Sequence, residues 1–479
     1  MTQDRKRAVV IDKKKLIPPF NLTLKGDDEP LECTCTDIIR LVPGKRAVLL
    51  GRWRGKTVVV KLFYKRFRAA KHLKMEVEGH RLLKKANIAT AGILHWGSVM
   101  EYRSKVLIFD YIHPSKNLGA TLKESRDKEL CREYLEKLMI LLARMHEAGL
   151  QHNDLHLDNF LVKDNELYAL DGAALYEKHR DAPLDRGASL KNLATLFAQQ
   201  NLGDKVLFME LASVYYAARK FDNRDKQLSL LKQLVKEARK FRTDRYLKKI
   251  YRESTETVCI KSFTSFLLCK RKNYTPAMAS FLQNPDIAFE GSGSTMLKRG
   301  NSATVVRFKV DDCDLVVKRY NVKDYIHALK RAFQKSRADR SWYGAHLLLE
   351  YGIRTPKPIA MKEIRLGLFR NRAYLICDYI GGISAQDYFK DPLPKGESDL
   401  SQKVLRIFER LESLQVSHGD MKATNIIIHD GNPFLIDLDS MAVHKSKALF
   451  ARARSKDIKR FMKNWTEKPE IATLFHLLK

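Results

Sequence analysis

Short apolar segments alternate with longer amphipathic stretches along this chain, and the same order occurs twice. Residues 58–61 and 315–318 are short, rich in β-branched side chains and end in a lysine, which predicts two strands. Apolar side chains recur at helical spacing over residues 135–145 and again over 404–414, so each stretch predicts an amphipathic helix. Each helix leads directly into a loop that carries His and Asp. The pattern therefore predicts an α+β fold.

The repetition extends to four motifs that occur in the same order in both halves of the chain. The offsets between equivalent residues are 257 for Lys61 and Lys318 (318 − 61), 268 for Asp110 and Asp378 (378 − 110), 266 for Asp154 and Asp420 (420 − 154), and 266 for Asp171 and Asp437 (437 − 171). A solenoid repeat is far shorter than this period. The nearly constant offset predicts a duplicated domain.

The duplication predicts two tandem domains, each with a small β-rich N-lobe and a larger helical C-lobe. The first domain is expected over residues 1–255, with its N-lobe at about 30–110 and its C-lobe at about 111–255. The second is expected over 275–479, with its N-lobe at about 290–378 and its C-lobe at about 379–479. Residues 256–274 are basic and weakly periodic, which predicts a connector between the domains.

Composition adds a strong positive charge to this picture. The 479 residues contain 88 Lys and Arg against 56 Asp and Glu, a formal charge of +32. Residues 219–272 carry 17 cations and 6 acids, and residues 445–463 carry 8 cations and one acid. Such a surface attracts anionic partners such as nucleotides, glycolipids, membranes or nucleic acid. No zinc-finger spacing or aromatic RNA-binding strand accompanies the charge, so nucleic acid is not the favoured partner.

Other classes of protein are not expected. No apolar run approaches the roughly 20 residues that span a bilayer, and the polar first 15 residues do not read as a secretory signal. The 7 cysteines are scattered, which predicts reduced thiols rather than disulfides or a zinc site.

Each half carries a strand Lys, an Asp followed by Asn five residues later, and a strand-end Asp 17 residues after the first Asp. Phosphoryl transfer needs this chemistry: positive charge beside the phosphates, a carboxylate beside the attacking hydroxyl, and hard oxygen ligands for Mg²⁺. The order matches the H-x-D-x-x-x-x-N signature of protein kinases.

The chain resembles the kinase-like superfamily, and in particular the lipopolysaccharide kinase family that includes the heptose kinases of the lipopolysaccharide core. The resemblance is carried by residues 418–425, 436–440, 317–321 and 352–358, and in the first copy by Lys61, Asp154, Asn159 and Asp171. It implies two kinase-like domains, ATP and Mg²⁺ as cofactors, and an anionic glycolipid acceptor bearing a core sugar hydroxyl. It also implies a cytoplasmic protein in peripheral contact with the anionic inner face of the inner membrane; no oligomeric state is predicted.

The resemblance assigns roles to residues of both copies. The catalytic residues are expected to be Asp154 and Asp420. Nucleotide binding is expected from Lys61, Glu78 (with Glu76 as the alternative helix acid), Lys318, Gly300 and Lys422. The metal ligands are expected to be Asn159, Asp171, Asn425 and Asp437.

Departures from the family pattern keep alternatives open. No Gly-rich array precedes Lys61, while Gly300 begins a small polar turn in the second copy. Tyr343 stands opposite Glu78, so the second copy lacks that helix acid, and Asp439 is interpreted as a metal-side carboxylate or a cap. The alternatives are a protein kinase, a small-molecule kinase, or one copy serving as a pseudokinase-like binding scaffold.

Overall fold

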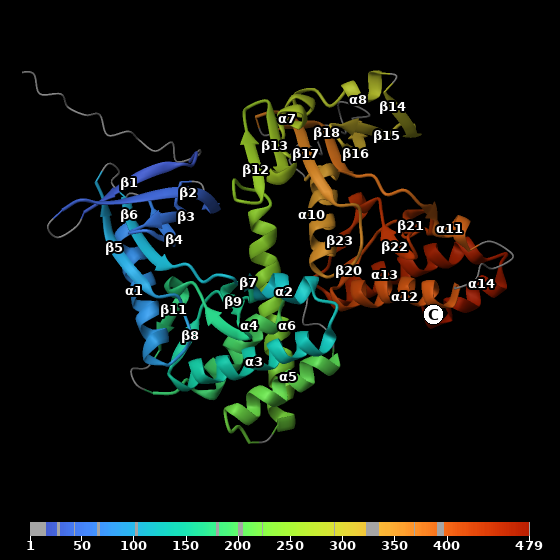
Figure 1. Ribbon diagram of the computed structural model, residues 1–479. Coiled ribbons are helices and arrows are strands. Elements are labelled where there is room, and N and C mark those ends of the chain that lie inside the picture. Colours follow the sequence, from blue (N-terminus) through green and yellow to red (C-terminus); the bar gives the residue numbers. More distant parts are fainter. Residues whose placement is uncertain are drawn as a thin grey trace, which may run out of the picture. The chain divides into compact units, whose positions relative to one another are not determined.

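The computed structural model describes most of the chain. The described residues are 16–25, 29–42, 44–64, 68–100, 104–178, 182–199, 205–222, 224–291, 293–321, 335–367, 369–389 and 397–478. The chain folds as two compact units, Met1–Arg242 and Thr243–Lys479 (Figure 1). Each unit pairs a β-rich lobe with a helical lobe, so the α+β fold of two bilobal units is confirmed.

The N-lobe of the first unit is a closed six-stranded barrel in the order β1-β2-β3-β4-β6-β5. Its strands are β1 (Phe20–Leu24), β2 (Leu31–Val42), β3 (Arg46–Trp53), β4 (Lys56–Phe63), β5 (Ile93–Val99) and β6 (Ser104–Asp110). In β4 the side chains of Val58, Val60 and Leu62 are buried in the barrel. Because successive side chains of a strand point to opposite faces, Lys61 lies on the outer face of the barrel.

Helix α1 (Ala69–Lys85) covers that outer face. Its buried side chains Leu73 and Val77 form one apolar cluster with Phe63, Leu107 and Phe109 of the barrel strands. The helical lobe follows in chain order. It comprises β7 (Lys116–Asn117), α2 (Leu118–Glu124), α3 (Lys128–Glu147), β8 (Leu150–His152), η1 (Leu157–Asn159), β9 (Phe160–Lys163), β10 (Glu166–Ala169), η2 (Gly172–Ala174), β11 (Leu175–Glu177), α4 (Arg186–Phe197), α5 (Lys205–Ala218) and the part of α6 (Arg224–Lys249) up to Arg242. The last turns of α6 belong to the second unit.

The N-lobe of the second unit is an open seven-stranded sheet in the order β12-β13-β17-β18-β16-β15-β14. The elements of this lobe are β12 (Thr257–Lys261), β13 (Ser265–Lys270), η4 (Arg271–Asn273), α7 (Pro276–Gln283), α8 (Ile287–Glu290), β14 (Ser294–Lys298), β15 (Ala303–Val310), β16 (Cys313–Tyr320), α10 (Arg337–Glu350), β17 (Pro358–Leu366) and β18 (Phe369–Asp378). Strands β15 to β18 correspond in order to β3 to β6 of the barrel, with β14 in the place of β2.

The C-lobe of the second unit repeats the order of the first. It comprises β19 (Ile383–Ser384), α11 (Ala385–Tyr388), α12 (Glu397–Ser413), β20 (Val416–Ser417), η5 (Ala423–Asn425), β21 (Ile426–His429), β22 (Asn432–Leu435), η6 (Leu438–Ser440), β23 (Ala442–Val443), α13 (Lys447–Met462), η7 (Lys463–Trp465), α14 (Pro469–Leu474) and η8 (His476–Leu478). Phe389, Phe461 and Trp465 of this lobe belong to one apolar core that also includes Trp342 of α10.

The strand register of the two sheets is the same around the two lysines. The residue three positions before Lys61 pairs with Asp110 of β6. The residue three positions before Lys318 pairs with Asp378 of β18. Two sheets of independent origin need not share this register, so the pairing supports the duplication that the motif offsets indicate.

The predicted connector and boundaries need correction. Residues 256–274 are not a connector, because β12 and β13 pair with each other and β13 pairs with β17 of the second sheet. The division between the units falls after Arg242 rather than near residue 255. The first N-lobe also begins earlier than residue 30, because β1 joins β2 and β5 and closes the barrel.

The structure bears on the cysteines and on membrane-spanning helices. All 7 cysteines are free thiols. Among the helices that the structure describes, none is long and apolar enough to cross a membrane.

The backbone of α1 touches the backbone of η2 at two glycines. A Cβ atom on Gly79 would lie 1.9 Å from the carbonyl oxygen of Gly172, and one on Gly172 would lie 2.5 Å from the carbonyl oxygen of Glu76. Neither position has room for a side chain. The two glycines therefore fix how closely the helix approaches the segment that follows β10.

Gly79→Ala is expected to lower the free energy of unfolding by about 3 kcal/mol, because the backbone of η2 has to move away. Gly187→Ala is the matched control in helix α4, where the nearest atom is Oδ1 of the Asp185 side chain at 3.3 Å. That control is expected to change the unfolding free energy by less than about 1 kcal/mol. Urea denaturation of both variants measures the difference, and equal effects would contradict the close approach.

Candidate active site

The loop between β8 and η1 presents Asp154 to solvent. The Asp154 backbone N–H donates to Nδ1 of His152 at 3.2 Å, and Nδ2 of Asn159 donates to the Asp154 carbonyl oxygen at 2.8 Å. Asn159 is buried, whereas the side chain of Asp154 is 73% exposed. The loop thus holds the backbone firmly while its carboxylate stays open to an incoming group.

The second unit builds the same loop with the same bonds. Asp420 donates its backbone N–H to Nδ1 of His418 at 3.3 Å and accepts from Nδ2 of Asn425 at 2.8 Å through its carbonyl oxygen. Its carboxylate differs from that of Asp154 because it contacts two cations. Arg460 lies 2.7 Å from Oδ1, and the Lys422 ammonium lies 3.1 Å from the carboxylate.

Both strand-end aspartates have left-handed backbone conformations. The φ angle is +60° at Asp171 and +61° at Asp437, a region that L-residues other than glycine seldom adopt. The residue before each Asp donates its backbone N–H to the carbonyl oxygen of Asn159 at 2.8 Å or of Asn425 at 2.9 Å. Each strand-end Asp is therefore attached to the loop that carries the predicted catalytic Asp of its unit.

In the first unit the strand lysine is held by an acid of helix α1. Lys61 donates to Oε1 of Glu76, whose side chain is fully buried. Oε2 of Glu76 accepts from the backbone N–H of Ala173 at 3.2 Å, two residues after Asp171. The pair thereby connects β4, α1 and the segment after β10. Arg46 of β3 approaches Asp171 at 3.9 Å from the barrel side.

Glu78 does not make this contact, which corrects the prediction. It is exposed, whereas Leu73, Glu76, Val77 and His80 form the buried face of α1. Residues two apart on a helix point in different directions, so Glu76 and Glu78 cannot share one partner. The acid that pairs with the strand lysine is Glu76.

A buried network keeps Glu76 ionised. Burial alone would raise the pKa of Glu76, but the charge and hydrogen bond of Lys61, with His80 Nε2 at 3.7 Å from Oε1, hold it well below its ordinary value. His80 Nδ1 is bonded to the Thr90 hydroxyl at 2.9 Å, and this hydroxyl donates to the Ala169 carbonyl oxygen at 2.8 Å. The network ties α1 to β10, the strand that leads to Asp171.

The second unit holds its strand lysine differently. Lys318 contacts Asp437 at 2.5 Å and Asp439 at 3.3 Å. Ser341 occupies the place of Glu76 in helix α10 (341 − 76 = 265), and its hydroxyl is bonded to that of Tyr320 at 3.0 Å. Burial alone would lower the pKa of Lys318, but Tyr320, Asp437 and Asp439 raise it above its ordinary value.

The acid that is missing from α10 is replaced by one in η6. Asp439 stands in the place of Ala173, whose N–H contacts Glu76 in the first unit (439 − 173 = 266). Its side chain is 5% exposed and is held by Arg337 at 2.6 Å. Asp439 is therefore a partner of Lys318 and Arg337. The Asp439 side chain also accepts from the Ser440 hydroxyl at 3.2 Å.

Gly300 lies in the turn between β14 and β15. The carbonyl oxygen of Gly300 accepts from the Asn321 side chain at 3.5 Å, and that of Ser302 accepts from Arg337 at 3.2 Å. Arg337 also holds Asp439, so it joins this turn to the Lys318 cluster. The sequence analysis did not single out Arg337, because nothing in the local pattern marks its distant partners.

Two further residues that the sequence analysis did not name support the catalytic loops. Asn192 of α4 accepts from the backbone N–H of His152 at 3.3 Å and donates to its carbonyl oxygen at 2.8 Å. Asp457 of α13 accepts from the backbone N–H groups of His418 at 2.7 Å and Gly419 at 3.0 Å. Extending the offset of 265 (457 − 192) along the chain would have revealed this pair.

In each unit, hydrogen bonds thus connect the predicted Asn to the predicted catalytic Asp and to the residue before the strand-end Asp. Their donor chemistry fits Mg²⁺: one Asp and one Asn per unit offer oxygen ligands, and Mg²⁺ is commonly held by one or two carboxylates together with substrate phosphates. In the described part of the chain, no group of three or more His, Cys, Asp or Glu side chains forms a metal cluster. The assignment of Asn159, Asp171, Asn425 and Asp437 as ligands remains a prediction.

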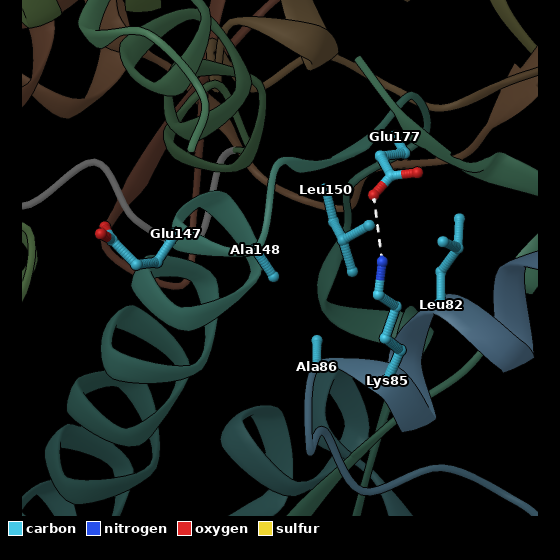
Figure 2. Close-up of a pocket in the computed structure, with 7 residues that line it drawn as sticks. All are labelled: Leu82, Lys85, Ala86, Glu147, Ala148, Leu150 and Glu177. Carbon is cyan, nitrogen blue, oxygen red and sulfur yellow. Dashed lines mark ion pairs between the residues drawn. The ribbon is translucent and has the colours of Figure 1, made fainter. Parts of the chain in front are cut away.

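A small pocket in the first unit lies apart from these groups. It has a volume of about 170 Å³ and is lined by Leu82, Lys85, Ala86, Glu147, Ala148, Leu150 and Glu177 (Figure 2). Lys85 and Glu177 form an ion pair of 3.8 Å at its wall. No residue of the predicted site lines this pocket, so it does not enter the chemistry argued below.

The chain was compared with families, curated proteins and solved structures. A family model described as the lipopolysaccharide kinase (Kdo/WaaP) family matches residues 59–201 and 288–473. The chain is 27% identical over 157 residues to the RIO-type serine/threonine-protein kinase Rio1 of Haloferax volcanii, covering 29% of this chain and 51% of that kinase. The chain thus spans about half the length of this curated relative. The kinase PK-1 of Cydia pomonella granulovirus is 19% identical, with a TM-score of 0.24, covering 30% of this chain and 52% of that protein.

Proposed function

Because this chain belongs to the lipopolysaccharide kinase (Kdo/WaaP) family, we propose that it transfers the γ-phosphoryl group of ATP to a sugar hydroxyl of the lipopolysaccharide core. A heptose is the proposed sugar, and the cytoplasmic face of the inner membrane is the proposed place of reaction. One observation carries the proposal. In each unit the Asn bonds to the loop Asp, and the strand lysine is held against the segment that carries the strand-end Asp. Lys61 reaches that segment through Glu76 and the backbone N–H of Ala173, whereas Lys318 contacts Asp437 directly.

The residues divide the work of phosphoryl transfer. Asp154 or Asp420 orients the acceptor hydroxyl and accepts its proton as the oxygen attacks phosphorus, and ADP leaves. Lys61 or Lys318 places positive charge beside the nucleotide phosphates. Bound Mg²⁺ supplies further neutralisation of phosphate charge, and Asn159 with Asp171, or Asn425 with Asp437, would hold it.

The two units are proposed to differ in the charge around the aspartate that faces the acceptor hydroxyl. Asp154 is open to solvent, whereas Lys422 and Arg460 stand at the carboxylate of Asp420. Two cations beside the attacking oxygen suit neutralisation of the transferring phosphoryl group or of an anionic acceptor.

An alternative role for the second unit follows from its altered lysine contact. Kinase activity requires a lysine held by a helix glutamate in the protein-kinase scheme, and Ser341 stands at that place in α10. In this alternative the second unit binds nucleotide or glycolipid as a scaffold. Phosphate transfer would then be unchanged when Asp420 is replaced by alanine.

Mass spectrometry of the glycolipid core tests the acceptor. A strain that lacks this chain is expected to carry a core short of one phosphate (about 80 Da), and the wild-type chain is expected to restore it. An unchanged core in that strain would contradict the glycolipid acceptor. Transfer by the purified protein to a peptide or an aminoglycoside, but not to glycolipid, would instead favour the protein-kinase or small-molecule-kinase alternative.

A further inference from the structure

Helix α13 of the second unit carries a cationic stripe on its exposed face. The stripe includes Lys445, two positions before the helix, and Lys463, one position after it. Its members are Lys445, Leu449, Arg452, Lys456, Lys459 and Lys463, all exposed. Their spacing alternates between four and three residues, which places them on one side of a helix. The opposite side, with Phe450, Asp457 and Phe461, is buried.

The five cations of the stripe lack acidic neighbours. Among the residues that the structure describes, no carboxylate lies within ion-pair distance of any of them. By contrast, Arg454 of the same helix pairs with Glu412 at 3.0 Å. The stripe is therefore positive charge that the protein itself does not neutralise.

The duplicated first unit shows that the fold does not need this charge. Helix α4 occupies the place of α13, and both anchor their catalytic loops through the equivalent residues Asn192 and Asp457. Yet α4 contains only two cations, Arg186 and Lys191. Since α4 holds its loop without a cationic stripe, the stripe of α13 is not needed to anchor the loop.

The position of the stripe connects it to the proposed chemistry. Arg460, next to Lys459 in α13, bonds to the carboxylate of Asp420 at 2.7 Å. Exposed apolar side chains accompany the charge: Leu449 is 59% exposed and Val443 of β23 is 50% exposed. An exposed cluster of cations attracts the anionic lipids of a membrane surface, and the exposed side chains of Leu449 and Val443 add apolar area to this surface.

We propose that the α13 stripe binds the anionic phospholipid surface of a membrane. Each Lys or Arg near such a surface strengthens binding, and the exposed side chains of Leu449 and Val443 add to it when they enter the lipid. The apolar residues favour lipid over nucleic acid, whose phosphates offer no apolar phase to Leu449. The contact would bring a glycolipid acceptor to Asp420, and this role rests on the proposed function. The binding of lipid by the stripe does not depend on it.

Vesicle sedimentation of the full-length protein without ATP tests the surface. The vesicles contain either phosphatidylcholine alone or phosphatidylcholine with one third phosphatidylglycerol. The triple variant Arg452→Glu, Lys456→Glu, Lys459→Glu is expected to bind the anionic vesicles on the order of 100-fold more weakly than the wild type. High salt is expected to weaken wild-type binding, because it screens exposed charges.

The matched control is a triple variant that makes the same change of charge on helix α6. Lys232, Lys236 and Lys240 are exposed on α6, and their replacement by glutamate is expected to reduce binding less than about 3-fold. If the glutamate variant does not fold, the variant with glutamine at the same three positions replaces it in the test. The glutamine variant is expected to weaken binding by about 10-fold or more.

Three results would overturn the proposal. They are equal loss of binding in the α13 and α6 variants, wild-type binding that does not depend on phosphatidylglycerol, and loss of duplex DNA or RNA binding in the α13 variant with vesicle binding intact. None of them bears on phosphate transfer to a detergent-dispersed acceptor, so this inference and the proposed function fail separately.

Discussion

Replacing Asp154 and Asp420 together by alanine is expected to lower the rate of phosphate transfer by about 10²- to 10⁴-fold, the usual contribution of a positioned proton acceptor. Both side chains stand on loops whose backbone bonds do not involve the carboxylate: the contacts of Asn159 and Asn425 at 2.8 Å go to carbonyl oxygens. The substitution therefore removes the acceptor of the proton while these bonds to the carbonyl oxygens remain. At Asp420 it also removes the contacts of the carboxylate with Arg460 and Lys422. Transfer of labelled γ-phosphate to core glycolipid measures the effect.

Single variants divide the effect between the two units. With both units active, Asp154→Ala and Asp420→Ala each leave the transfer by the other unit. Asp158→Ala is the matched control, because this carboxylate is 70% exposed in the same loop as Asp154. The control is expected to retain wild-type transfer within about 2-fold. Undiminished transfer by the double variant would contradict the assignment of both aspartates.

Glu76→Gln is expected to lower the free energy of unfolding by about 3 kcal/mol, because it breaks a buried ion pair and leaves the Lys61 charge without its partner. The Glu76 side chain is fully buried and that of Lys61 is 15% exposed. Glu78→Gln is the matched control, with the same chemical change two residues away on the exposed face of α1. Its expected effect is within about 0.5 kcal/mol.

The loss of unfolding free energy caused by Glu76→Gln is expected to be smaller at acidic pH than at neutral pH. The folded-state pKa of Glu76 lies below its unfolded value of about 4.3, so the carboxylate stabilises the fold fully above about pH 5. This contribution is lost as the pH falls below 4.3 and through the folded-state pKa. The difference between wild type and variant should therefore shrink in acid. Urea denaturation at pH 7 and pH 4 measures it; a difference that grows in acid would contradict the ion pair.

The repeat allowed the candidate catalytic groups to be chosen from the sequence, because phosphoryl transfer requires particular residue types as well as spacing. Asp154, Asn159 and Asp171 recur at one offset, and the structure places each recurrence in the same backbone geometry, including φ near +60° at Asp171 and Asp437. A turn that served packing alone would tolerate other residues. This part of the site could therefore be found from the sequence.

The choice between Glu76 and Glu78 was within reach of the sequence but was missed. The buried face of α1 runs through Leu73, Val77 and His80, and helical spacing places Glu76 on this face and Glu78 off it. Weighing the apolar stripe of the helix against each glutamate would have selected Glu76.

The error over residues 256–274 has a different cause. Strand β13 contains the apolar run Phe266–Cys269, which predicts a buried strand. Basic residues on both sides dominated the composition and suggested a connector. Composition of a window is a poor guide where a short buried strand is flanked by solvent-exposed lysines and arginines.

In the second unit the acid that contacts Lys318 comes from η6 instead of the helix, and this change can be seen only in the three-dimensional contacts. Asp439 lies beyond the strand-end Asp and Arg337 lies about 100 residues upstream, yet they meet at 2.6 Å. No periodicity links the two positions, so only the folded chain reveals that an acid in η6 takes the place of one in the helix.

Locating the transferred phosphate tests the central claim most directly. Purified protein is incubated with Mg²⁺, ATP labelled in the γ-phosphate, and dephosphorylated core glycolipid, and the product is fragmented by mass spectrometry. The account predicts one new phosphate on a heptose of the core, formed only with Mg²⁺ and absent with the Asp154→Ala, Asp420→Ala variant. Label that remains in ATP, or that appears on the glycolipid equally with that variant, would contradict it.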